Sequence, residues 1–71
     1  MRGKAYAIMS GKDVVAISLS RLNAQEICMD YALETSLEVY NGMVGGYGHE
    51  IAIAYALDEL DSWQIWEFNL V

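Results

Sequence analysis

The chain has 71 residues, of which 55% are hydrophobic and 20% charged, and its formal net charge is −6. This length allows at most one domain, and the apolar content argues against intrinsic disorder. One cysteine excludes an internal disulfide framework, no apolar run is long enough to span a membrane, and the amino-terminal residues are too polar for a signal peptide, so we expect a protein of the reducing cytoplasm.

A β-hairpin is expected at the start of the chain. Residues 4–10 and 13–19 each alternate apolar residues with the period of a strand: Tyr6, Ile8, Val15, Ile17 and Leu19. Gly11 and Lys12 between them fit a two-residue turn in which the glycine takes a positive φ.

A helix is expected from about Asn23 to about Tyr40. Asn23 can cap its start, and Glu26 three residues later completes a capping box. Asn41 and Gly42 favour a left-handed stop. An apolar stripe on this helix is expected to cover the hairpin: Ala24, Ile27, Cys28, Tyr31 and Val39, with Thr35 in line.

Residues 42–48 are rich in glycine and are interpreted as a flexible connector. Residues 49–60 are favoured as a second helix, because they contain three alanines and two leucines. That helix would turn four residues inward: Ile53, Ala56, Leu57 and Leu60. A strand is the alternative, because Ile51, Ile53, Tyr55 and Leu57 also alternate with period 2.

Residues 63–71 are aromatic and branched and are predicted to form a closing strand. Its two faces carry Trp66, Phe68 and Leu70, and Trp63, Ile65 and Val71; we expect Trp63 and Ile65 on the outer face. The predicted fold is one small α+β domain over residues 1–71. It has a three-stranded antiparallel sheet, element order ββααβ, and helices packed on one face. The alternative order is ββαββ.

Charge is segregated along the chain. The four basic residues all lie within the first 21 positions, whereas residues 22–71 hold nine acids and neither lysine nor arginine. Such a surface disfavours direct binding of nucleic acid and repels anionic membranes. A basic protein surface would attract it. The simpler interpretation is that net charge keeps an apolar chain dissolved.

Four acids recur every fourth residue on the first predicted helix: Glu26, Asp30, Glu34 and Glu38. The row would extend about 18 Å along the helix. Like charges at this spacing destabilise a helix by about 0.2–0.5 kcal/mol per pair. A row of carboxylates can take the place of phosphates in a basic groove. The alternative is an ordinary solvated face, on which salt screens the repulsion.

A second apolar stripe follows the same helix: Met29, Leu33, Leu37 and Tyr40. Either the second helix or the glycine-rich segment covers these residues, or they dock onto a partner. Aromatic residues and methionine are enriched at docking faces.

No catalytic constellation is evident. His49 and Glu50 are adjacent, so on a helix they point about 100° apart and form no dyad. Cys28 lies on an apolar stripe, where a free cysteine acts as a small hydrophobic residue. The glycine-rich segment matches no phosphate-binding motif. We therefore expect no enzymatic activity, no cofactor and no metal.

In size, acidity and lack of catalytic residues, the chain resembles the small inhibitors that phages encode against host or defence proteins, including anti-CRISPR proteins. This is a likeness of type, and no residue positions carry over from it. We expect a non-enzymatic inhibitor that occludes a basic surface of a nucleic-acid-binding protein or nuclease. The predicted contact residues are Glu26, Asp30, Glu34, Glu38, Met29, Leu33 and Leu37. The alternative is an obligate homodimeric structural or subunit protein, which buries Met29, Leu33 and Leu37, or Trp63 and Ile65, against a second copy.

Overall fold

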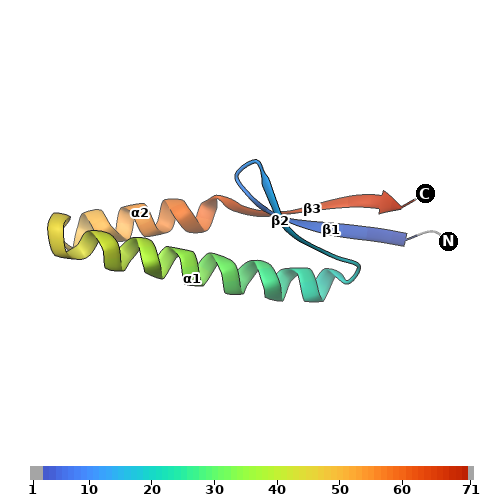
Figure 1. The fold of residues 1–71 in the computed structure, drawn as a ribbon, viewed down its shortest axis with the longest axis horizontal. Helices are drawn as coiled ribbons and strands as arrows, with labels where there is room; N and C mark the ends of the chain where they lie inside the picture. Colours follow the sequence, from blue (N-terminus) through green and yellow to red (C-terminus); the bar gives the residue numbers. More distant parts are fainter. Residues whose placement is uncertain (1–2, 71) are drawn as a thin grey trace.

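The computed structural model describes residues 3–70 and confirms the predicted order ββααβ. Strands β1 (Gly3–Ser10), β2 (Asp13–Ser18) and β3 (Trp63–Leu70) form one antiparallel sheet in the order β2-β1-β3. Helices α1 (Arg21–Tyr47) and α2 (His49–Asp61) run antiparallel to each other (Figure 1). The alternative with a strand near residues 49–60 is wrong.

The β1–β2 turn has the predicted backbone conformation. Gly11 takes a φ of 61°, and the turn brings Ser10 opposite Asp13. The pairing then shifts between Ile8 and Met9, so that Val15 becomes the extra residue of a bulge. The simple alternation predicted for this strand therefore breaks at Val15.

Helix α1 begins earlier than predicted. Its N-cap is Ser20, whose side chain accepts a 3.2 Å hydrogen bond from the backbone N–H of Asn23. Asn23 instead donates through its side-chain amide to Ser18 Oγ, 3.0 Å away. The prediction of Asn23 as the cap was wrong because the helix begins at Arg21, so the N–H of Asn23 is itself an unpaired donor of the first turn, and Ser20 accepts from it.

Helix α1 also ends later than predicted. It continues through Asn41 and Gly42 to Tyr47, giving 27 residues or about 40 Å. The break comes at Gly48, whose φ of 89° and ψ of 170° suit only glycine. Glycine inside a helix weakens it without ending it, so the glycine-rich segment is the last turns of a helix and not a flexible loop.

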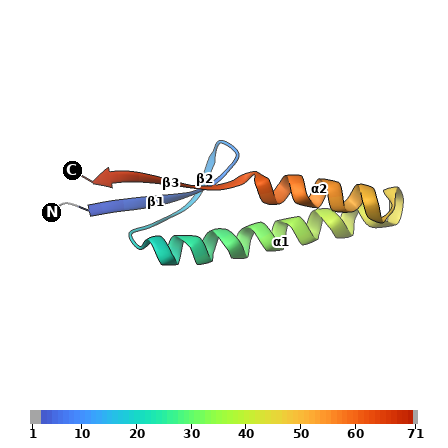
Figure 2. The same cartoon turned by 180° about the vertical axis from the view of Figure 1, so that it is seen from behind.

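The two helices occupy different places along a long molecule. The first half of α1 lies beside the sheet, and α2 pairs with the half of α1 that extends beyond it (Figures 1 and 2). The principal extents are 53 × 18 × 14 Å. The Cα radius of gyration is 14.8 Å, against about 11 Å for a compact chain of this length.

The sheet turns one face to α1. Ile8 on this face is fully buried. Trp63 stacks on Tyr31 of α1 with ring centroids 5.5 Å apart, and its indole N–H donates to Thr35 Oγ1 at 3.1 Å. Thr35, predicted in the core-facing stripe, therefore contacts the sheet, as does Tyr31.

The predicted orientation of the last strand was wrong. Trp63 and Ile65 lie on the α1 side, whereas Trp66, Phe68 and Leu70 point to the other side and are 59%, 41% and 40% exposed. Both faces of this strand are apolar, so the period of 2 groups the residues correctly but does not say which group is covered. Val71 lies outside the described residues.

The fully buried residues of the helices are small. They are Ala24, Ala32 and Ser36 on α1 and Ala52 on α2. Ile53 and Leu57, predicted to turn inward, are 37% and 54% exposed, while Ala56 and Leu60 are half-buried. Small side chains permit close approach of backbones, and this leaves the larger side chains on the flanks.

Candidate interaction surface

All four acids of the predicted row lie on α1 and are exposed: Glu26, Asp30, Glu34 and Glu38. Four residues turn a helix by about 400°, so the row winds about 40° at each step. Its two ends therefore face directions about 120° apart. The middle pair, Asp30 and Glu34, lines a common hollow.

The acidic row is not neutralised from within the described part of the chain. The ion pair found among residues 3–70 joins Lys4 Nζ to Glu67 Oε2 at 3.4 Å, and both side chains are about half exposed. Of the described basic residues, Lys4 and Lys12 lie in the β-hairpin and Arg21 is the first residue of α1. The helical hairpin formed by α1 and α2 therefore carries acidic residues but, after Arg21, no lysine or arginine.

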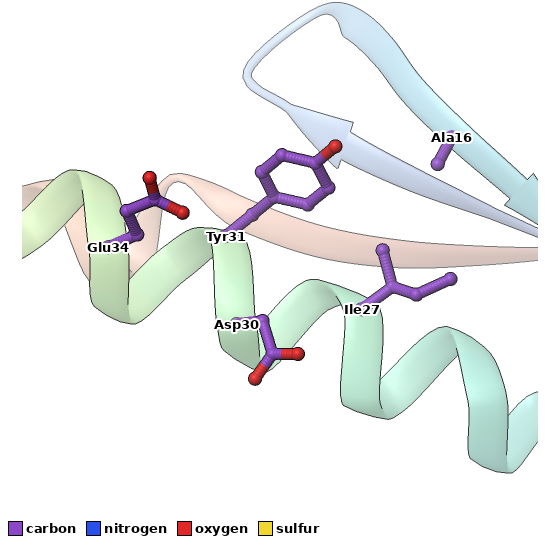
Figure 3. A pocket seen from close by; sticks show the side chains of 5 residues that line it. All are labelled: Ala16, Ile27, Asp30, Tyr31 and Glu34. Carbon is purple, nitrogen blue, oxygen red and sulfur yellow. The ribbon is translucent and has the colours of Figure 1, made fainter.

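A hollow of about 410 Å³ lies between α1 and β2. Asp30 and Glu34 line it together with the apolar groups of Ile27 and Tyr31, and Ala16 of β2 lies opposite (Figure 3). The hollow is open to solvent. It combines two carboxylates with an aromatic and aliphatic wall, the composition that suits the stem and charged head of a lysine or arginine.

Packing against the sheet fixes the aromatic wall of this hollow. Tyr31 stacks on Trp63 with an interplanar angle of 6°. Thr35 donates its hydroxyl to the Tyr31 carbonyl at 2.8 Å and accepts the Trp63 indole N–H. The hollow is thus supported by β3 and needs no ligand to position Tyr31.

The second apolar stripe of α1 is open to solvent. Met29, Leu33 and Leu37 are 62%, 49% and 60% exposed, so α2 does not cover them. Met29 also borders a second hollow, of about 390 Å³, between α1, Leu60 and β3. Tyr40 is half-buried, and its hydroxyl lies 2.8 Å from His49 Nδ1.

Two hollow-lining residues were assigned to the core by the sequence pattern. Ile27 and Tyr31 belong to the stripe predicted to cover the hairpin, yet Ile27 is only half-buried and Tyr31 is 40% exposed. Their spacing with Asp30 and Glu34 already places all four residues along one side of a helix. The position of Ala16 beside these α1 residues depends on tertiary structure, and no pattern in the sequence indicates it.

The remaining reactive groups form no constellation. Within the described part of the chain, no three residues among the histidine, cysteine and acids cluster as a metal site. Cys28 is half-buried, and burial raises the pKa of its thiol. A raised pKa keeps the sulfur protonated and lowers its nucleophilicity near neutral pH.

Over residues 3–70, neither helix combines the length and the apolar character required to cross a bilayer. Comparison of the chain with protein-family models, with curated proteins and with solved structures finds no match.

Proposed function

We propose that this chain is a non-enzymatic interaction protein that binds a basic surface of a partner protein through α1 and occludes it. The partner class that best fits is a nucleic-acid-binding protein or nuclease, because its phosphate-binding surface is broad and positive. The observation that carries the proposal is the hollow at Asp30 and Glu34, which holds two carboxylates beside an apolar wall.

The charge distribution supports this function. An acidic helix without neighbouring cations attracts a basic surface over long range and speeds encounter at low salt. Self-repulsion along α1 is relieved when arginine or lysine side chains of the partner enter between the carboxylates. Binding would then remove the like-charge repulsion that destabilises α1 in the free protein.

The apolar neighbours supply affinity that salt does not screen. Met29, Leu33 and Leu37 leave about half or more of their surface in water. Burying side chains of this kind contributes about 25 cal/mol per Å². The proposed mechanism is competitive: carboxylates occupy the sites of phosphates, and the apolar side chains slow dissociation.

The direct test reverses the charge of the middle pair, in the double variant Asp30→Lys with Glu34→Lys. Immobilised native chain is first used to capture a partner from nuclease-treated lysate of the source cell, and heparin is then used as a competing polyanion. We expect heparin and high salt to release the partner, and the double variant to bind it more weakly by about tenfold or more.

The matched control is Asp58→Lys with Asp61→Lys, which changes net charge equally on exposed positions of α2. This control should retain most of the binding. Equal binding by the native chain and the Asp30/Glu34 variant would refute the proposal. Equal weakening by both double variants would show that net charge alone, and not the α1 surface, governs capture.

A further inference from the structure

The face of the sheet turned away from α1 is apolar and open. Five large side chains on its two edge strands are exposed: Val14, Ile17, Trp66, Phe68 and Leu70. On the central strand, Ala5 and Ala7 pair directly with Phe68 and Trp66 and are almost fully buried. The aromatic side chains therefore form a continuous surface over the middle of the sheet.

The open face lacks the polar residues expected on the solvated face of a sheet. An antiparallel sheet normally places polar residues toward water. On β3, however, the outward residues include one polar side chain, Gln64, whereas Glu67 and Asn69 lie on the α1 side. On β1, Lys4 likewise lies on the α1 side. The open face carries no charged residue among the described strands.

The total exposed surface of the chain is larger than that of a compact monomer. The chain exposes 5316 Å², against about 4,400 Å² for a compact monomer of 7.9 kDa. The excess, roughly 900 Å², is spread over the whole elongated chain, whereas a standard interface buries roughly 800 Å² of each partner. With residue areas of roughly 150–250 Å², the five exposed side chains alone provide about 500 Å² per copy.

We propose that two copies of this chain dimerise by packing their open sheet faces against each other. Sheets stack face to face about 10 Å apart through interdigitated apolar side chains. Two chains of net charge −6 repel, so they associate best through the face without carboxylates.

The helical hairpin is a poorer self-association surface. Its exposed Leu33 and Leu37 stand among Asp30, Glu34 and Glu38, so pairing two hairpins would oppose like charges. Helix α1 lies on the opposite side of the sheet from the open face. Dimerisation through that face therefore leaves both acidic helices outside, and this inference does not depend on the proposed function.

Sedimentation equilibrium of the purified chain is the test. We expect the native protein at 15.8 kDa, twice 7.9 kDa, at micromolar concentration. Trp66→Lys places a charge at the centre of the interface and should raise the dimer dissociation constant by about 30-fold or more. Ile17→Lys, on the other edge strand, should act in the same direction.

Leu37→Lys is the matched control, because Leu37 is 60% exposed and Trp66 is 59% exposed. It should leave the dimer intact. Circular dichroism accompanies each measurement, since an obligate dimer unfolds when it dissociates. Loss of fold on dilution in the Trp66 and Ile17 variants, but not in the control, also supports the proposal.

A native chain that stays at 7.9 kDa up to about 100 µM would overturn the proposal. A dimer that survives both Trp66→Lys and Ile17→Lys would overturn it too, because pairing through strand edges tolerates charges on the open face. Dissociation by Leu37→Lys alone would assign the contact to the helices instead.

Discussion

The sheet and the helical hairpin both expose large apolar side chains, but in different electrostatic surroundings. On the open sheet face, Trp66 and Phe68 have no charged neighbour among the outward residues. On α1, Leu33 and Leu37 are interleaved with carboxylates. A partner for the sheet needs only complementary shape, whereas a partner for the hairpin must also supply positive charge.

The two regions also differ in how they are held together. The sheet buries Ile8 completely beneath α1, and Trp63 joins β3 to the same helix. The helical hairpin contributes small buried residues, such as Ala32 and Ala52. Because alanine buries little apolar area, the hairpin is stabilised less by its own packing, and its large side chains remain available for contacts with other molecules.

The largest difference should appear when a large side chain is shortened in each region. Ile8→Ala should lower the free energy of unfolding by about 2–5 kcal/mol, because it leaves a cavity at the most buried large side chain. Leu33→Ala, on the exposed side of α1, should change it by less than about 0.5 kcal/mol. Urea unfolding at one fixed protein concentration compares them, and similar losses would contradict the exposure of Leu33.

The glycine at the helix break and a glycine inside α1 should respond to alanine substitution in opposite directions. Gly48→Ala should destabilise by about 1–3 kcal/mol, because its φ of 89° is strained for any residue with a Cβ. Gly45→Ala should stabilise by about 0.5–1 kcal/mol, since a Cβ there meets no atom within 4 Å and favours helix. Thermal unfolding measures both. A stabilising Gly48→Ala would mean that α1 and α2 are not separated at this residue.

Relieving the repulsion along α1 should stabilise the free protein. Glu34→Lys removes like-charge contacts with Asp30 and Glu38 and should gain up to about 1 kcal/mol at low salt. The gain should shrink at about 1 M salt, where the Debye length is about 3 Å. Melting curves at both salt levels test this. The melting temperature of Glu34→Gln should lie between those of the native chain and Glu34→Lys. A gain independent of salt would point to helix propensity instead.

The smallest expected effect concerns Cys28. Because burial raises the pKa of this thiol, iodoacetamide should label it more slowly at pH 8 than it labels the same protein unfolded in urea. The proton is held more tightly in the folded state, so its contribution to stability is complete below the pKa of the unfolded thiol and is lost as pH rises through the raised folded pKa. Mass spectrometry follows labelling from neutral to alkaline pH, and equal rates in the two states would exclude burial of Cys28.

Much of the fold follows from local patterns. Gly11 in the turn and the closing strand form as predicted, because the first has a required backbone conformation and the second a clear period. Residues 49–60 form the favoured helix, although their period also fits a strand. The ends of α1 do not, because Ser20 and Asn23 are both good caps and Asn41–Gly42 only favours a stop. Where two local solutions have similar free energies, packing along the rest of the chain selects one.

The amino-acid sequence alone determined the acidic row and the segregation of charge, because spacing and residue type are local properties. It favoured the order ββααβ but left ββαββ open, and the helix His49–Asp61 decides between them. Tertiary structure decided which side of β3 meets α1, and it placed Ala16 of β2 across the hollow from α1. The physical reason is that a strand with two apolar faces satisfies the alternation rule in either orientation. Only the docking of Trp63 onto Tyr31 and Thr35 fixes one orientation and leaves Trp66 and Phe68 in solvent.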